Sequence, residues 1–232
     1  MSEVQYQPSI LIVGASRGIG LGLVREYLSR GWRVIATERR PSVALAGLAA
    51  NADSRLVVKT LDINDRDQIS ALADSLRGES LDVLIVNAGV SDNANQTINE
   101  ITTEEFAHVM VTNALSPLRV IETLSRVVKA EGRVAAMSTA LASISTNTDG
   151  GYETYRASKV ALNMLLRSLV VRAGGQRSFL ALMPGWVRTD MGGPDAPVEV
   201  KESVRGLADV IDQHAGKPGL VFVDYQGNTI PW

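Results

Sequence analysis

Tyr155 and Lys159 are the two residues whose types and spacing point most directly to acid–base chemistry. They lie four positions apart near the beginning of a predicted helix, 152–172, so the phenol and the ammonium share one helical face. A tyrosine near its reference pKa of about 10 is a poor base at neutral pH. A cation beside the phenol favours the phenolate and lowers that pKa, which would make Tyr155 a usable acid–base catalyst. Because surface pairs of this kind are common on helices, the interpretation needs support from the rest of the chain.

A glycine-rich turn near the start of the sequence could hold phosphate groups. The apolar run 10–13 predicts a buried strand, and Gly14, Gly18 and Gly20 follow it in the pattern G-x-x-x-G-x-G. Glycines let the backbone approach a pyrophosphate, and the N-terminus of the helix that follows offers unpaired N–H groups. A β–α connection without a ligand is the alternative. The candidate cofactor-binding residues of this turn are Gly14, Ser16, Arg17, Gly18, Ile19 and Gly20.

Predicted strands and helices alternate along the whole chain. The predicted strands are 10–13, 33–37, 55–59, 83–86, 133–138, 179–183 and 220–223. Helices are predicted up to residue 30 and over 42–50, 65–76, 103–130, 152–172 and 199–214. Asn64 is the expected N-cap of helix 65–76, and Pro117 is expected to break or kink helix 103–130.

Seven strands separated by helices indicate a single α/β domain over residues 1–232, with a doubly wound parallel sheet of the Rossmann type. Ligands bind such sheets at the carboxyl ends of the strands. Polar or glycine-containing segments follow six predicted strands in turn, which predicts a binding cleft at that edge. These segments are 14–20, Glu38 with Arg39, Asp62, 87–89, Ser138 with Thr139, and Pro184 with Gly185.

Composition excludes several classes of function. The chain has 232 residues and a net charge of −2, which argues against nucleic acid as its main partner. It has no cysteine, so disulfides and thiolate catalysis are excluded, and its two histidines are too far apart to suggest a metal site. No apolar leader or run of 18 apolar residues occurs, so we expect a cytoplasmic protein that does not bind membranes.

Over residues 9–225 the motifs together resemble the classical short-chain dehydrogenase/reductases. Gly14, Gly18 and Gly20 match the family's glycine motif, with Val13 at its usual threonine, and Val86 stands before Asn87-Ala88-Gly89 where the family has a further asparagine. The other matching residues are Asn113, Tyr155 with Lys159, and Pro184, Gly185, Val187 and Thr189 around the expected nicotinamide site. The resemblance implies an NAD(P)-dependent oxidoreductase that transfers a hydride between the nicotinamide and a carbonyl or alcohol substrate.

The resemblance also implies roles for three residues. Tyr155 would protonate the carbonyl oxygen during reduction, or remove the hydroxyl proton in the reverse direction. Lys159 would hold the ribose hydroxyls and lower the pKa of Tyr155. Asn113 would help to hold a water that relays protons from Lys159, although an asparagine that stabilises a kink near Pro117 is a compatible alternative.

The hydroxyl group that polarises the substrate is less clearly marked. The family places a serine after the fifth strand, often as the second of two serines, and this chain has Ser138-Thr139 there. That alignment favours Thr139, whose hydroxyl is chemically competent although its β-branch restricts χ1. Ser138 is the second choice and Ser143 the third.

The cofactor depends on the residues after the second strand. A carboxylate there selects the 2′-hydroxyl of NAD, whereas an arginine accommodates the 2′-phosphate of NADP. Glu38 and Arg39 offer both, and Arg17 adds a second arginine, so NADP is favoured over NAD. Asp62 matches the family's adenine-contacting aspartate, with a turn residue as the alternative.

Segments 147–151 and 184–193 resemble the small carbonyl reductases of the sniffer and C-factor types. By that resemblance Trp186, Met191 and loop 91–101 would line a mostly apolar pocket for a small carbonyl or alcohol substrate. The alternative is a signalling or sensor protein that binds the dinucleotide with little turnover. The long helices resemble those that pair in this family, so a homodimer or homotetramer is expected.

Overall fold

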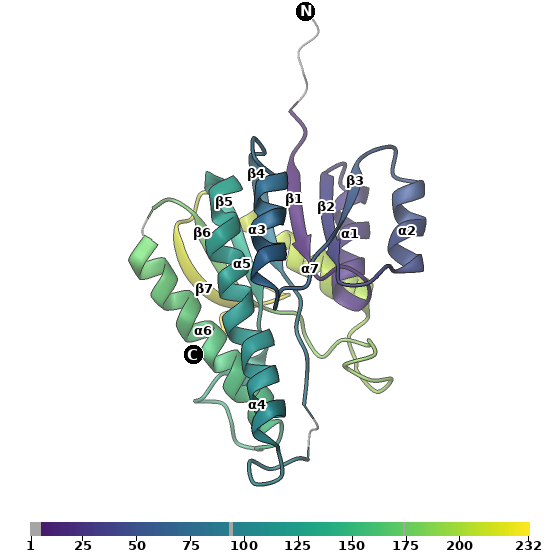
Figure 1. Cartoon of the computed structure of the whole chain (residues 1–232). Coiled ribbons are helices and arrows are strands. Elements are labelled where there is room, and N and C mark those ends of the chain that lie inside the picture. The colour runs from purple at the N-terminus through teal and green to yellow at the C-terminus, as the bar shows by residue number, and fades with distance from the viewer. Residues whose placement is uncertain (1–5, 93–94, 174) are drawn as a thin grey trace, which may run out of the picture.

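The computed structural model describes residues 6–92, 95–173 and 175–232. Its core is a seven-stranded sheet in the order β3-β2-β1-β4-β5-β6-β7, and every neighbouring pair of strands is parallel (Figure 1). The strands are β1 (Ser9–Val13), β2 (Arg33–Glu38), β3 (Leu56–Thr60), β4 (Leu81–Val86), β5 (Val128–Met137), β6 (Ser178–Met183) and β7 (Gly219–Asp224). The predicted doubly wound α/β fold is confirmed. The chain order reverses between β1 and β4, where such sheets form a crevice for ligands.

Helices cover both faces of the sheet. They are α1 (Gly18–Ser29), α2 (Val43–Ala50), α3 (Arg66–Ser75), α4 (Thr103–Met110), α5 (Ser116–Leu124), α6 (Glu153–Ala173) and α7 (Val200–Gln213). In Figure 1, α3 and α5 lie in front of the sheet, with α1 and α7 behind it. Two hydrophobic cores result, one between the sheet and α3, α5 and α6, the other between the sheet and α1, α2 and α7.

β1 contributes to both cores because its side chains alternate. Leu11 and Val13 belong to the core under α3 and α5, whereas Ile10 and Ile12 belong to the core under α1 and α7. All four side chains are fully buried, and each such burial contributes about 1.5–3 kcal/mol to folding. The strand therefore fixes the start of the glycine turn from both faces.

The predicted helical region 103–130 extends too far at its C-terminus, and its interruption lies just before Pro117. It is divided into α4, a π-helical turn at Val111–Leu115 and α5, and it ends in a 3₁₀ turn at Ser125–Val127 before β5 begins at Val128. Pro117 lies in the first turn of α5 and does not break the chain's helical path. Because a proline cannot donate a backbone hydrogen bond and its ring crowds the carbonyl four residues earlier, the π turn absorbs the irregularity there.

The predicted N-cap of α3 is displaced by one residue. Asp65, not Asn64, is the cap, and its side chain accepts from the N–H groups of Asp67 and Gln68 at 2.9 and 3.1 Å. Asn64 donates instead to Thr112 Oγ1 at 3.0 Å and accepts from Ser116 Oγ at 2.7 Å. Both residue types cap helices well, so the pattern could not distinguish them, and Asn64 joins the β3–α3 connection to the π turn.

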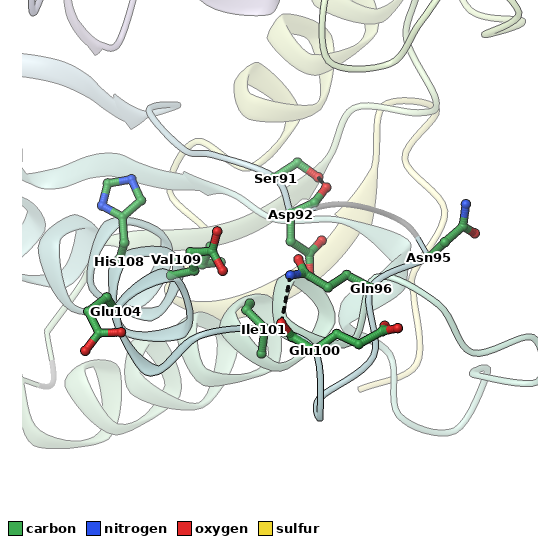
Figure 2. A pocket seen from close by; sticks show the side chains of 10 residues that line it. Ser91, Asp92, Asn95, Gln96, Glu100, Ile101, Glu104, His108 and Val109 are labelled. Carbon is green, nitrogen blue, oxygen red and sulfur yellow. Dashed lines mark hydrogen bonds between the residues drawn. The ribbon is translucent and has the colours of Figure 1, made fainter.

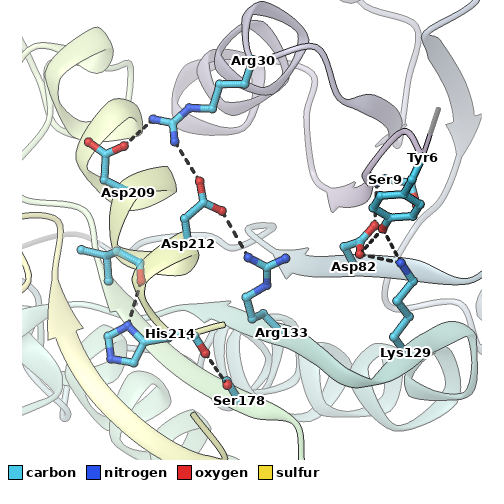
Figure 3. Close-up of polar contacts among 11 residues, drawn as sticks. Tyr6, Ser9, Arg30, Asp82, Lys129, Arg133, Ser178, Asp209, Asp212 and His214 are labelled. Atoms are coloured by element: carbon cyan, nitrogen blue, oxygen red, sulfur yellow. Dashed lines mark hydrogen bonds and ion pairs between the residues drawn. The ribbon is translucent and has the colours of Figure 1, made fainter. Parts of the chain in front are cut away.

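Ion pairs connect the helices and strands at the edge of the sheet opposite the carboxyl ends of the strands (Figure 3). Arg30 at the end of α1 contacts Asp209 at 2.7 Å and Asp212 at 3.0 Å on α7, and Asp212 also contacts Arg133 of β5 at 3.2 Å. Near the beginnings of β4 and β5, Tyr6, Asp82 and Lys129 form a second polar cluster. These contacts hold the framework without occupying the carboxyl edge.

Candidate active site

The turn between β1 and α1 is held open by hydrogen bonds from neighbouring strands. Thr37 Oγ1 accepts from the Gly14 N–H at 3.1 Å, and Asn87 Nδ2 donates to the Gly14 carbonyl at 2.8 Å. Arg17 is the N-cap of α1, but its side chain makes no capping bond, and the first turn contains no acidic residue. The first N–H groups of α1 and their positive dipole end therefore face the crevice as an anion site.

Close packing explains the glycines of this turn. A Cβ on Gly14, whose φ is +87°, would lie 2.7 Å from the Ala88 nitrogen, and a Cβ on Gly20 would lie 2.1 Å from the Gly14 carbonyl oxygen. A Cβ on Gly18 would lie 3.4 Å from Thr189 Cγ2, so the turn also meets the loop after β6. Ile19 packs on the core under α1 and α7. The end of β4 thus supports the turn directly through Ala88.

The segment after β2 orients its acidic and basic residues differently. Glu38 is half-buried, and its Oε2 accepts from the Ser42 N–H at 2.8 Å. Ser42 Oγ donates to the Ser16 carbonyl at 2.8 Å, which ties this segment to the glycine turn. Arg39 and its neighbour Arg40 are exposed, and neither makes an ion pair within the described ranges 6–92, 95–173 and 175–232.

Asp62, after β3, behaves as a turn residue in this structure. Its Oδ1 accepts from the Asn64 N–H at 2.9 Å, the local bond that aspartates make in turns. A contact with adenine stays a prediction for Asp62.

α6 places Lys159 beside Tyr155, as the spacing predicts. The Lys159 Nζ lies 5.8 Å from the centroid of the Tyr155 ring and donates to the Met137 carbonyl at 2.9 Å. Lys159 is buried, and this burial lowers its pKa to about 8. A buried ammonium with one carbonyl partner retains two N–H groups for other acceptors, which ribose hydroxyls could supply.

The electrostatic effect on Tyr155 differs from the expectation. Burial, the charge of Asp92 and the neighbouring Tyr152 raise the pKa of Tyr155 to about 12. Asp92 Oδ2 accepts from the Tyr155 backbone N–H at 3.0 Å, whereas the Lys159 ammonium is directed to the Met137 carbonyl. The phenol is therefore protonated at neutral pH, which suits a proton donor.

Asn113 links the end of β4 to α6. Its Oδ1 accepts from the Val90 N–H at 2.8 Å, and its Nδ2 donates to the Val90 carbonyl at 2.8 Å and to Ser158 Oγ at 3.0 Å. A Cβ on Gly89 would lie 3.1 Å from Asn113 Oδ1 and 3.4 Å from the Lys159 Nζ, so Gly89 leaves room for both groups. The Asn113 carbonyl lies four residues before Pro117, which has no N–H to donate to it. The water-binding role of Asn113 stays a prediction.

The three candidate hydroxyls differ in availability. Thr139 is half-buried, and its Oγ1 accepts from the Leu141 N–H at 3.2 Å, which leaves the hydroxyl hydrogen to donate. Ser138 is buried and donates to Asn163 Oδ1 at 2.8 Å. Ser143 is also buried, with its Oγ 3.4 Å from Ser145 Oγ. Of the three, Thr139 is the one that is half-buried rather than buried, and its role as the substrate-polarising hydroxyl stays a prediction.

The loop after β6 is fixed from α7 and β7. Ser203 Oγ donates to the Pro184 carbonyl at 2.6 Å. Gly185 has a φ of +88°, and a Cβ at this position would lie only 3.0 Å from the Tyr225 ring. Val187 is buried, and Thr189 Oγ1 accepts from the Gly192 N–H at 3.1 Å. Thr189 therefore faces the glycine turn across the crevice.

A cavity of about 860 Å³ lies between loop 91–101 and α4 (Figure 2). Its described lining consists of Ser91, Asp92, Asn95, Gln96, Glu100, Ile101, Glu104, Glu105, His108 and Val109. Eight of these ten residues are polar and four of them are acidic. The cavity shares loop 91–101 with the predicted substrate pocket, and the apolar character of that pocket stays a prediction. Trp186 and Met191 are exposed and do not line it, and positions 93 and 94 of the predicted pocket loop lie outside the described residues.

Neither a metal site nor a membrane-spanning helix is found among the residues that the structure describes. No group of three histidine, cysteine, aspartate or glutamate side chains there could hold a metal ion. No helix among them is long and apolar enough to cross a bilayer.

The family model for short chain dehydrogenases matches residues 8–198. This chain belongs to the short-chain dehydrogenase family. A short-chain dehydrogenase/reductase from Burkholderia multivorans with bound NADP is 45% identical, with a TM-score of 0.95 and coverage of 98% of this chain and 100% of that one. Carbonyl reductase Sniffer of D. melanogaster is 31% identical, with a TM-score of 0.88 and coverage of 98% and 100%.

C-signal of Myxococcus xanthus is 43% identical over 160 residues, which covers 66% of this chain and 93% of that protein. The family assignment confirms an NAD(P)-dependent oxidoreductase that acts on C=O and CH–OH groups, and the signalling alternative is not favoured. The presence of Tyr155 and Lys159 on one face of α6 agrees with this assignment.

Proposed function

We propose that this short-chain dehydrogenase uses NADP(H) to reduce the carbonyl group of a small molecule. The hydrogen bond from the Ser42 N–H to Glu38 Oε2, 2.8 Å long, carries the choice of cofactor. It directs one oxygen of the carboxylate that would select the 2′-hydroxyl of NAD towards the backbone, while Arg17 and Arg39 stay exposed to receive a 2′-phosphate. The NADP bound to the Burkholderia multivorans relative supports the same choice.

The site's features fit a dinucleotide. The N–H groups of the first turn of α1 would receive the pyrophosphate, which the glycines at 14 and 18 allow to approach. Asn87 and Gly89 would maintain the floor of the crevice, and Thr189 would contact the nicotinamide end together with Pro184, Gly185 and Val187.

In the proposed reaction, the chemistry that bound NADPH would supply is a hydride for the carbonyl carbon. Tyr155 donates its phenolic proton to the carbonyl oxygen, which completes the alcohol, and Thr139 donates a hydrogen bond to the same oxygen. Lys159 orients the ribose and passes a proton back to the phenolate. A water on the Asn113 carbonyl connects Lys159 with solvent. Ser138 stays engaged with Asn163 and supports the end of β5.

Titration of the protein with NADPH and with NADH, followed by fluorescence, tests the choice of cofactor. We expect NADPH to bind at least tenfold more tightly, which corresponds to about 1.4 kcal/mol. Arg39→Gln should weaken NADPH binding and leave NADH binding unchanged, because only NADPH carries the phosphate. Tighter binding of NADH would assign the selection to Glu38 and overturn the proposal.

Three further features stay predictions of the sequence. They are the action of residues 1–232 as a single domain, a cytoplasmic location and an assembly of two or four copies. Sedimentation of the purified protein would test the assembly directly.

A further inference from the structure

Arg17 and Asp190 form an ion pair across the cofactor crevice. Arg17 Nη1 lies 2.9 Å from Asp190 Oδ2, and the pair joins the N-cap of α1 to the loop after β6. Their chain neighbours Gly18 and Thr189 are also close together, since a Cβ on Gly18 would lie 3.4 Å from Thr189 Cγ2. Two consecutive residues of the glycine turn therefore lie beside two consecutive residues of this loop.

The Arg17–Asp190 ion pair is exposed, so another anion can replace Asp190 as the partner of Arg17. The side chains of Arg17 and Asp190 are 77% and 75% accessible to solvent, and an ion pair of that exposure contributes about 0–1 kcal/mol. A phosphate binds a guanidinium through two parallel, charge-assisted hydrogen bonds and is the stronger partner. An arriving phosphate can thus displace the Asp190 carboxylate from Arg17.

The side chains of Trp186 and Arg188 make their hydrogen bonds to residues that follow them closely in the chain. Trp186 Nε1 donates to the Gly192 carbonyl at 2.7 Å, and the Arg188 guanidinium donates to the Ala196 carbonyl at 3.1 and 3.2 Å and also contacts Glu199. Loss of the Arg17–Asp190 contact would therefore leave the loop's other hydrogen bonds in place.

We propose that Asp190 competes with the 2′-phosphate of NADP(H) for Arg17, and so acts as a specificity-determining residue. The inference rests on the proposed use of NADP(H). Binding of a 2′-phosphorylated cofactor breaks the Arg17–Asp190 pair and releases Asp190. A cofactor with a 2′-hydroxyl has no anion at that position and leaves the pair intact. Asp190 thus lowers the affinity for NADP(H) selectively.

The test compares Asp190→Asn with Asp195→Asn, which removes the same charge from the same loop. Asp195 is exposed and makes no ion pair within the described part of the chain. Asp190→Asn should tighten NADPH binding about two- to fivefold, the fold-change that corresponds to the upper range for an exposed pair. Asp195→Asn should change it little, and NADH binding should be equal in all three proteins.

An Arg17→Gln background separates the two proposals. In that background Asp190→Asn should have no further effect on NADPH binding, because the shared partner is gone. If Arg17→Gln leaves NADPH binding unchanged, the assignment of Arg17 to the phosphate fails, and the competition fails with it. If Arg17→Gln weakens NADPH binding but Asp190→Asn tightens it no more than Asp195→Asn does, only the competition is overturned.

Calorimetric titration with fragments that lack nicotinamide provides a readout independent of catalysis. Adenosine 2′,5′-bisphosphate carries the 2′-phosphate, whereas AMP carries only the 5′-phosphate. The gain from Asp190→Asn should appear with the bisphosphate and be absent with AMP. An equal gain with both ligands would show a general charge effect and overturn the competition.

Discussion

Asp92 Oδ2 accepts a hydrogen bond from the backbone N–H of Tyr155 at 3.0 Å, which places a carboxylate at the first turn of α6 beside the proposed acid. The other oxygen of Asp92 is buried and has no hydrogen-bond partner in the part of the chain that the structure describes. With burial as the larger cause, the Asp92 charge raises the pKa of Tyr155 to about 12. The arrangement favours a protonated phenol at neutral pH, the form that can donate a proton to a carbonyl oxygen.

Asp92→Asn should lower the pKa of Tyr155. The amide oxygen retains the bond to the Tyr155 N–H, while removal of the negative charge stabilises the phenolate. The alkaline limb of kcat/KM for carbonyl reduction should move to lower pH, and alcohol oxidation at pH 7–8 should become faster. Glu104→Gln is the matched control, because Glu104 lines the same cavity but is not among the groups that raise the pKa of Tyr155. Superimposable pH profiles for the two variants would contradict this role of Asp92.

Lys159→Met should stabilise the protein at neutral pH while it abolishes turnover. Burial lowers the pKa of Lys159 to about 8, so between that pH and the ordinary lysine range the unfolded chain binds more protons than the folded one. Wild-type stability should therefore rise with pH from about 8 to about 10.5. The gain from Lys159→Met, up to about 3 kcal/mol below pH 8, should shrink over the same interval. Urea unfolding of both proteins at a series of pH values measures the difference in their free energies of unfolding. A difference that does not vary with pH would refute the lowered pKa of Lys159.

Thr139→Ala should reduce kcat/KM for reduction about a hundredfold or more, whereas Thr139→Ser should keep most of the activity. Only the serine variant retains a hydroxyl that can donate to the substrate oxygen. Ser138→Ala should instead leave the Asn163 amide buried without its partner and lower the free energy of unfolding by about 1–3 kcal/mol. Steady-state kinetics and thermal melts of the three variants distinguish these roles. Activity lost in Ser138→Ala but kept in Thr139→Ala would reverse the assignment.

Gly14→Ala should be more damaging than Gly31→Ala. Both glycines have similar positive φ angles, +87° and +81°, so both variants carry the strain of an L-residue there, about 1 kcal/mol. Only at Gly14 would the new Cβ also lie 2.7 Å from Ala88, while at Gly31 it meets nothing within 4 Å. The free energy of unfolding should fall by at least another 1 kcal/mol for Gly14→Ala, and its melting temperature should be the lower of the two. Equal losses would show that Ala88 gives way and that the close approach is unimportant.

Much of the framework could be predicted from sequence because its signals are local. The buried run at β1, the spacing of Gly14, Gly18 and Gly20, and the interval from Tyr155 to Lys159 each depend on residues close together in the chain. The end of helix 103–130 could not be predicted in this way. Residues 128–130 suit a helix by composition, but pairing of Val128 with Leu81 makes them the start of β5.

The missed site residues all act through contacts that are distant in sequence. Thr37 resembles an ordinary strand residue until it accepts from the Gly14 N–H, and its only sequence signal is a hydroxyl near the end of a buried strand. Asp92 lies in a polar loop 63 residues before Tyr155. Asp190 meets Arg17 across 173 positions of chain. Burial and the charge of Asp92 raise the pKa of Tyr155. The four-residue spacing between Tyr155 and Lys159 contains no information about either effect, so the direction of the pKa change could not be predicted.

The most direct test of the account is NADPH oxidation with a panel of ketones and aldehydes, for the wild-type protein and Tyr155→Phe. We predict that the wild type consumes NADPH in step with alcohol formation. Tyr155→Phe should bind NADPH with unchanged affinity and turn over at least a hundredfold more slowly, as expected for loss of a general acid. Carbonyl reduction that proceeds as fast in Tyr155→Phe as in the wild type would contradict the central claim that this phenol is the proton donor.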